Sequence, residues 1–197
     1  MTFYKVIYTI FAPLFKLVYR IRVTGRENIP EGAAVMCANH SANLDPVFMC
    51  IACGRRHNWL FMAKAELFKI PGLNLLIKAL GAISVNRGAT DISTLRNAIS
   101  ALGEGKKVMI FPEGTRVKKG EDSEGAKTGA AMIASRAKVP MVPVYISRDK
   151  HLFGRVDVII GKPVSTEIAE KGQAKYRMLS DEVFGEIMRL GSGETNA

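Results

Sequence analysis

The chain has 197 residues, enough for one domain with a sizeable core, and its 48% hydrophobic and 23% charged residues are typical of a globular protein, which excludes disordered and fibrous classes. Twenty-eight lysines and arginines stand against 18 aspartates and glutamates, for a formal net charge of +10. Such a basic surface favours nucleic acid, an anionic bilayer face or phosphorylated substrates, and charge alone does not choose among them.

Residues 1–20 are expected to form a helix with an apolar centre. Val6 to Phe15 is nearly all apolar, is interrupted by Pro13, and has basic residues on both sides. A run of this length is too short to cross a bilayer core, which needs about 20 apolar residues, and no signal-peptide cleavage region follows it. We expect a helix lying in the headgroup region of a membrane; the alternative is a helix docked on the protein's own core.

The elements then alternate between strands and helices. Strands are expected at residues 20–24, 33–38, 58–63, 81–87, 107–111, 141–146 and 156–160, and helices at 47–54, 65–80, 91–103, 129–137 and 174–190, with a charged surface loop at 117–126. This alternation predicts a single α/β domain with a largely parallel central sheet flanked by helices. The expected division is an interfacial helix at 1–20, the main domain at 21–190 and a polar tail at 191–197.

Three cysteines lie in apolar segments, which fits reduced, buried thiols in a cytosolic compartment. Cys50 and Cys53 form a C-x-x-C with His57 close behind, but no second Cys/His pair completes four ligands. We therefore expect Cys37, Cys50 and Cys53 to pack in the core and expect no metal site.

The segment from Asn39 to Pro46 lies between a buried strand and a helix. His40 comes where the strand stops, and Asp45 before Pro46 is a helix-start signature in which the carboxylate accepts from the free first-turn N–H groups. The short loop also lets the carboxylate fold back to the imidazole, which would give a general base and its orienting partner. The alternative is a simple helix cap and a polar loop histidine.

Several polar residues follow the ends of other expected strands, as His40 does. Carboxyl ends of parallel strands meet at one edge of a sheet, where ligands bind. The cations among these residues suit a phosphate, and Gly114 allows a positive φ or a close approach to a ligand. The residues expected at this edge are His40, Lys64, Arg87, Glu113 and Arg116.

Four ordered blocks carry a family resemblance. They are Asn39-His40 with Asp45 (NHxxxxD), Gly81 to Arg87 (GxIxxxR), Phe111 to Arg116 (FPEGTR) and the VP-containing strand at 139–143. In order and spacing they resemble the glycerolipid acyltransferases, most closely the bacterial enzymes that act on 1-acyl-glycerol 3-phosphate. The similarity runs from about Arg22 to Lys162.

The resemblance implies direct acyl transfer to the free sn-2 hydroxyl of a lysophosphatidate, with no covalent acyl-enzyme, no cofactor and no metal. An acyl carrier protein or coenzyme A thioester would supply the acyl group. His40 would deprotonate the hydroxyl and Asp45 would orient His40. By the same resemblance, the glycerol phosphate would be bound by Arg87, Glu113, Gly114, Thr115 and Arg116, joined by Lys64.

Three further expectations concern the surroundings of this chemistry. The N–H groups of Phe48 and Met49, at the start of the helix, would stabilise the oxyanion. The protein would sit peripherally on the anionic cytoplasmic face of the cell membrane, where its lysophosphatidate acceptor resides. One rival function is the same acyl transfer to glycerol 3-phosphate or another lysophospholipid. The other is a non-catalytic basic protein that binds anionic lipid or nucleic acid. No nucleic-acid-binding signature is visible, so no nucleic-acid partner is expected.

Overall fold

The structure, a computed structural model, describes residues 2–54, 59–69, 72, 74, 77, 82–85, 92–117, 120–121, 123 and 125–193. Within these residues seven strands form one sheet in the order β1-β7-β6-β2-β5-β3-β4. All neighbouring strands pair in parallel except β6 and β7, so the largely parallel sheet is confirmed. The strands are β1 (Arg20–Thr24), β2 (Ala34–Ala38), β3 (Trp59–Lys64), β4 (Ala82–Val85), β5 (Lys107–Ile110), β6 (Met141–Ile146) and β7 (Arg155–Ile160).

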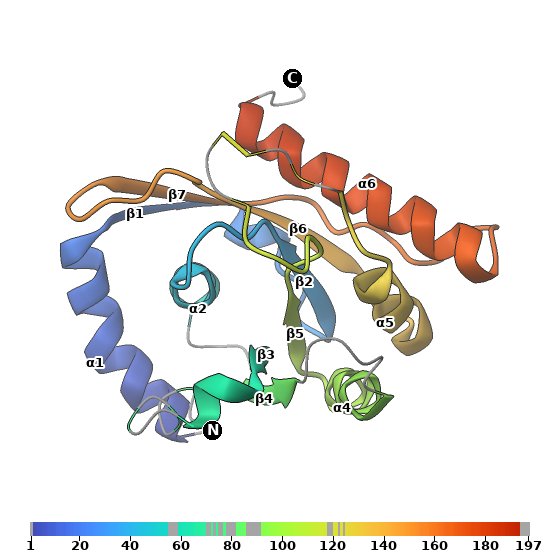
Figure 1. Ribbon diagram of the computed structural model, residues 1–197, viewed down its shortest axis with the longest axis horizontal. Helices are drawn as coiled ribbons and strands as arrows, with labels where there is room; N and C mark the ends of the chain where they lie inside the picture. The colour runs from blue at the N-terminus through green and yellow to red at the C-terminus, as the bar shows by residue number, and fades with distance from the viewer. Residues whose placement is uncertain are drawn as a thin grey trace.

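Helices cover both faces of the sheet, which gives the expected three-layer α/β arrangement (Figure 1). One face carries α1 (Thr2–Val18) and α2 (Asp45–Cys53), and the other carries α4 (Ile92–Gly103), α5 (Gly129–Ala137) and α6 (Gly172–Ser192). Two short 3₁₀ helices, η1 (Arg26–Asn28) and η2 (Ala65–Lys69), lie between strands. Among the described helices, none has the length and apolarity that a bilayer crossing requires.

The middle of the sheet decides where polar side chains can gather. The completely buried strand β2 lies between β5 and β6 and is parallel to both, so these three strands end at the same edge. Next to β5, β3 has the same direction. β7 is antiparallel to β6 and parallel to β1. Strands β1 and β7 therefore run in the opposite direction and begin at this edge.

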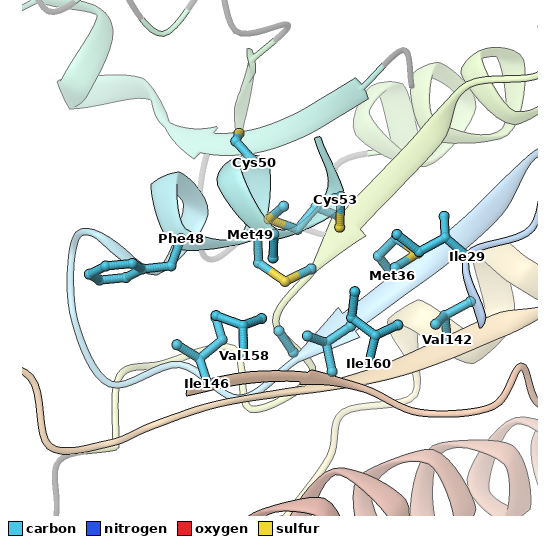
Figure 2. Packing of buried hydrophobic residues seen from close by; sticks show 14 of the residues in the cluster. Ile29, Met36, Phe48, Met49, Cys50, Cys53, Val142, Ile146, Val158 and Ile160 are labelled. Atoms are coloured by element: carbon cyan, nitrogen blue, oxygen red, sulfur yellow. The ribbon is translucent and has the colours of Figure 1, made fainter. Parts of the chain in front are cut away.

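The core on the α2 side is built from one helix and the inner strands. Phe48, Met49 and Cys53 of α2 pack with residues of β2, β6 and β7 (Figure 2). Burial raises the pKa of Cys37 and Cys53 to about 12 and raises the pKa of Cys50 as well, so all three thiols stay protonated. Buried cysteines are therefore confirmed; His57 lies outside the described residues.

Helix α2 is fixed at its carboxyl end by an arginine. The Arg26 guanidinium donates from Nε to the Ala52 carbonyl at 2.7 Å, which satisfies a terminal carbonyl and complements the negative end of the helix. The helix stops at Gly54, whose φ of 77° favours glycine. The expected helix at 65–80 begins instead as η2, and most of its remainder lies outside the described residues.

Candidate active site

His40 and Asp45 meet at the carboxyl end of β2. The His40 Nδ1 lies 3.0 Å from Asp45 Oδ2, and both residues are buried. Because a carboxylate can only accept, this contact selects the neutral tautomer that carries its proton on Nδ1 and leaves a lone pair on Nε2. The structure thus brings together the base-and-partner pair expected from the sequence.

The expectation that Asp45 caps its helix is wrong. The carboxylate turns back into the preceding loop, where Oδ2 accepts from the Ser41 N–H at 2.7 Å and the Ala42 N–H at 2.8 Å. Asp45 is already the first residue of α2, and Leu44 occupies the capping position without a side-chain hydrogen bond. Asp45 therefore shapes the loop around His40 rather than the end of the helix.

Lys150 reaches the same carboxylate from the loop after β6. Its ammonium is almost fully buried, lies 2.9 Å from Asp45 Oδ1 in an ion pair, and donates to Ser41 Oγ at 2.6 Å. Burial alone would raise the pKa of Asp45. The hydrogen bond from His40, the charge of Lys150 and the Ala42 N–H outweigh that effect and hold the pKa below its usual value. Asp45 is therefore ionised at neutral pH.

Glu113 is buried and holds the backbone of His40. Its Oε2 accepts from the His40 N–H at 2.6 Å, and its Oε1 accepts from Arg148 at 2.9 Å. Arg148 also donates to the Val117 carbonyl at 2.6 Å, while the Val117 N–H donates to the His40 carbonyl at 2.8 Å. Residues from the ends of β2, β5 and β6 thus form one closed set of contacts around His40.

Two further contacts fix the residues next to the dyad. The Asn39 side-chain amide donates to the Ile146 carbonyl at 2.9 Å and accepts from the Ile146 N–H at 2.7 Å, which extends the pairing of β2 with β6 beyond their strands. The Phe111 ring stacks on the His40 ring with centroids 4.1 Å apart. The imidazole therefore has a defined plane as well as a defined partner.

The expected phosphate-binding residues that the structure describes next to the dyad differ in exposure. Arg116 is exposed and donates to Asn43 Oδ1 at 2.7 Å, which places its guanidinium beside the His40 loop. Thr115 is exposed, and Gly114 has a φ of 70°. The backbone of Lys64 ends β3, whereas Arg87 lies outside the described residues.

Comparison with known proteins identifies the family of this chain. The family model described as "Acyltransferase" matches residues 20–147, which include β2, the dyad and the FPEGTR segment. The chain belongs to the acyltransferase family. The resemblance seen in the sequence motifs is thereby confirmed at the level of the family.

Individual relatives of this acyltransferase chain carry a more specific name. This chain is 32% identical over 139 residues to the 1-acyl-sn-glycerol-3-phosphate acyltransferase of Borreliella burgdorferi, and the alignment covers 68% of this chain but only 54% of that protein. It is 32% identical over 150 residues to the Bacillus subtilis enzyme of the same name, covering 73% of each. The crystal structure of the 1-acyl-sn-glycerophosphate acyltransferase PlsC from Thermotoga maritima aligns with a TM-score of 0.69 at 28% identity, covering 100% of this chain and 79% of that one.

An acyl-transfer reaction needs donors for its oxyanion, and the donors expected from the sequence are not free. The Phe48 N–H donates to the Leu44 carbonyl at 3.1 Å, so that expectation is wrong. Met49 is the fifth residue of α2, where the N–H belongs to the regular i→i−4 pattern of the helix. The reason is that α2 starts at Asp45, earlier than the sequence suggested, which moves both residues inside the hydrogen-bonded helix.

Sequence reasoning also missed residues of this acyltransferase site. Asn43, Arg148 and Lys150 were not expected there, although Arg148 and Lys150 follow β6 and so end at the same edge as His40. The strand-end rule that selected Lys64 and Arg87 would have selected them as well. The VP-containing block at 139–143 marks the start of β6, whereas Arg148 and Lys150 lie in the loop after the end of that strand.

Proposed function

We propose that this protein transfers a fatty acyl group from a thioester donor to the free sn-2 hydroxyl of 1-acyl-glycerol 3-phosphate. The observation that carries the proposal is the buried His40–Asp45 pair, 3.0 Å apart at the edge where Arg116 is also held. The relatives named above act on 1-acyl-sn-glycerol 3-phosphate according to their names, which supports the same acceptor here.

In the proposed reaction His40 Nε2 takes the proton of the acceptor hydroxyl as its oxygen attacks the thioester carbonyl carbon. Asp45 stabilises the imidazolium that forms. The tetrahedral intermediate then expels the thiolate, the carbon–sulfur bond breaks, and the imidazolium returns its proton to the leaving sulfur. An ester and a free thiol result. No acyl group is attached to the enzyme, and no cofactor takes part.

The acceptor phosphate is proposed to lie against Arg116, Thr115 and Gly114, with Lys64 and Arg87 as further cations. Exposed guanidinium groups bind phosphate oxygens in pairs, which supports this assignment for Arg116. Glu113 was grouped with these residues, but both of its oxygens already accept hydrogen bonds. A buried carboxylate would also repel a phosphate, so we assign Glu113 to positioning His40 instead.

The proposed location is the cytoplasmic face of the cell membrane, with peripheral attachment. Helix α1 exposes Ile10, Leu14 and Leu17, whose spacing puts them on one face of the helix. An amphipathic helix with basic neighbours binds in the interfacial plane of anionic lipid. This location gives the active site access to an acceptor that resides in the bilayer.

The proposal is tested by assaying the purified protein with lysophosphatidate and with glycerol 3-phosphate. Each acceptor is combined with an acyl carrier protein thioester and with a coenzyme A thioester. We expect turnover with lysophosphatidate and a loss of roughly 10²–10⁴-fold in His40→Ala, because a general base contributes that much. Preference for glycerol 3-phosphate would show a different acceptor, and full activity of His40→Ala would overturn the mechanism.

The phosphate assignment has its own test in Arg116→Lys. A forked, two-point donor becomes a single charge, so the KM for lysophosphatidate is expected to rise roughly tenfold while the KM for the thioester stays near its normal value. Arg136→Lys, on the exposed side of α5, is the matched control and should change neither constant. Equal effects of Arg116→Lys on both KM values would contradict the assignment.

A further inference from the structure

The loop between β6 and β7 carries an apolar tip that the protein itself does not cover. Leu152 is 63% exposed and Phe153 is 67% exposed. Single exposed apolar residues are common, but two large ones in succession at the end of a loop are not explained by packing.

This tip lies directly beside the end of α1. The Phe153 N–H donates to the Val18 carbonyl at 2.8 Å, and the Arg20 N–H donates to the Gly154 carbonyl at 3.0 Å. Figure 1 shows the turn before β7 next to the end of α1 that leads into β1. Leu17, one residue before Val18, is 76% exposed. We name Leu17, Leu152 and Phe153 the tip patch, which continues the exposed apolar face of α1.

The backbone of the loop is shaped to keep Phe153 outside. Phe153 has a φ of 61°, a left-handed conformation that is rare and strained for a bulky residue. Its hydrogen bond to Val18 and the Gly154 N–H, which donates to the His151 carbonyl at 3.0 Å, hold this conformation. A side chain at Gly154 would contact the His151 ring as it now lies, so that exposed ring would have to move. A strained residue that is held in place and exposed indicates a function at its side chain.

The charges around the tip patch favour an anionic partner. Lys16, Arg20 and Arg155 are exposed near it, and Arg20 and Arg155 are register partners on the neighbouring strands β1 and β7. Arg155 also pairs with Asp157 at 2.9 Å, and the one nearby acid on the loop, Asp149, lies 3.8 Å from His151. Basic side chains beside exposed apolar ones match the headgroups and acyl chains of an anionic bilayer.

We propose that the tip patch is a second membrane contact, in which Leu152 and Phe153 insert into an anionic bilayer beside α1. This inference rests on the membrane-surface part of the proposed function and adds a second anchor to it. Lys150, two residues before Leu152 in the same loop, contacts Asp45, so one loop carries the tip and also reaches the catalytic pair. Two contacts rather than one would fix the orientation of the active site above the lipid surface.

Tryptophan fluorescence tests insertion directly. The chain has a single tryptophan, the buried Trp59, so Trp59→Phe combined with Phe153→Trp places one probe at the tip. We expect a blue shift with phosphatidylglycerol vesicles and quenching by brominated acyl chains. Trp59→Phe with Met178→Trp, an exposed apolar position on α6, is the matched control and should remain unquenched. A protein that sediments with the vesicles while the Phe153→Trp probe stays unquenched would overturn the proposal.

A second variant keeps the inference separate from the acyltransferase reaction. Leu152→Asn combined with Phe153→Asn should weaken binding to phosphatidylglycerol vesicles by roughly tenfold or more, since each buried side chain contributes to affinity. Turnover of a short-chain, monomeric acceptor should be unchanged, because neither residue contacts the dyad. Unchanged vesicle affinity would refute the second contact. If the wild-type protein transfers no acyl group to any acceptor, the proposed reaction fails while both vesicle measurements still decide the inference.

Discussion

At the scale of single residues, His40 is fixed through its backbone and its ring together. Glu113 and Val117 hold its N–H and carbonyl, Asp45 binds Nδ1, and Phe111 stacks on the ring. In the proposed role of general base, a histidine positioned in this way would need little reorganisation when the substrate binds. The contacts that give this precision come mostly from residues that cannot reach a substrate.

Lys150→Met should move the acid-side loss of activity to higher pH. The pKa of Asp45 is lowered in the folded state, so its stabilising effect is present above the ordinary aspartate pKa and is lost as the pH falls below it. Removing the Lys150 charge leaves the His40 and Ala42 hydrogen bonds alone to oppose burial, so this pKa rises. We expect the acid-side loss of kcat/KM to move to higher pH and the stabilisation from ionised Asp45 at neutral pH to shrink. Denaturant unfolding and kinetics between pH 3 and 7 measure this shift. Lys162→Met, at an exposed position, is the control. An unchanged pH dependence of kcat/KM in Lys150→Met would show that Lys150 does not set the pKa of Asp45.

Glu113→Gln separates positioning of His40 from phosphate binding. The amide keeps one accepting oxygen but loses the charge that pairs with Arg148. We expect kcat to fall roughly tenfold or more with little change in the KM for lysophosphatidate, because a misplaced base slows chemistry without removing a phosphate contact. Steady-state kinetics with each substrate varied in turn measure kcat and both KM values. A raised KM for lysophosphatidate at normal kcat would show instead that Glu113 takes part in phosphate binding.

At the scale of the secondary-structure elements, Asn39 joins the ends of β2 and β6 where their backbones have stopped pairing. Asn39→Ala would leave the buried N–H and carbonyl of Ile146 without their partners, at a cost of about 2–4 kcal/mol in the free energy of unfolding. The adjoining His40 would also lose its alignment, so kcat should fall in the protein that remains folded. Thr166→Val removes a buried hydrogen bond to Val139, away from the site, and should lower stability without lowering kcat. Equal kcat values in both variants would mean that Asn39 serves the fold alone.

The same elements explain which parts of the site could be foreseen from the sequence. The buried run before His40 and the Asp45-Pro46 step predict a strand, a loop and a helix, and the short loop allows the two side chains to meet, as the structure shows they do. Periodicity does not tell which way a buried carboxylate turns. The predicted helix-capping role of Asp45 is wrong for this reason. The contacts of Glu113 with His40 and Arg148 likewise depend on the direction of its side chain and could not be read from the sequence. The strand-end rule applies to Lys150 and Arg148 as well, but it cannot say which cation contacts which carboxylate, and the structure shows Lys150 at Asp45 and Arg148 at Glu113.

At the scale of the whole molecule, the topology gathers chemistry from distant parts of the chain. β2, β5 and β6 are neighbours in the sheet although long segments separate them in sequence, and each delivers one part of the site at its carboxyl end. Helix α1 packs on the same face as α2, the helix that begins with Asp45. The proposed contact of α1 with lipid would therefore also set the distance between the His40–Asp45 pair and the bilayer.

The net charge of +10 predicts that membrane binding depends on lipid charge and on salt. Each well-placed cation near an anionic surface contributes about 1 kcal/mol, and this attraction is screened over about 10 Å at 0.1 M salt. We expect co-sedimentation with phosphatidylglycerol vesicles at low salt, a loss of roughly tenfold or more in affinity at 0.5 M sodium chloride, and weak binding to phosphatidylcholine vesicles. Residual binding at high salt measures the combined apolar contribution of α1 and the tip patch, and Leu14→Asn should reduce the part from α1 while leaving the salt dependence intact. Equal binding to charged and neutral vesicles would show that the basic surface serves a partner other than the membrane.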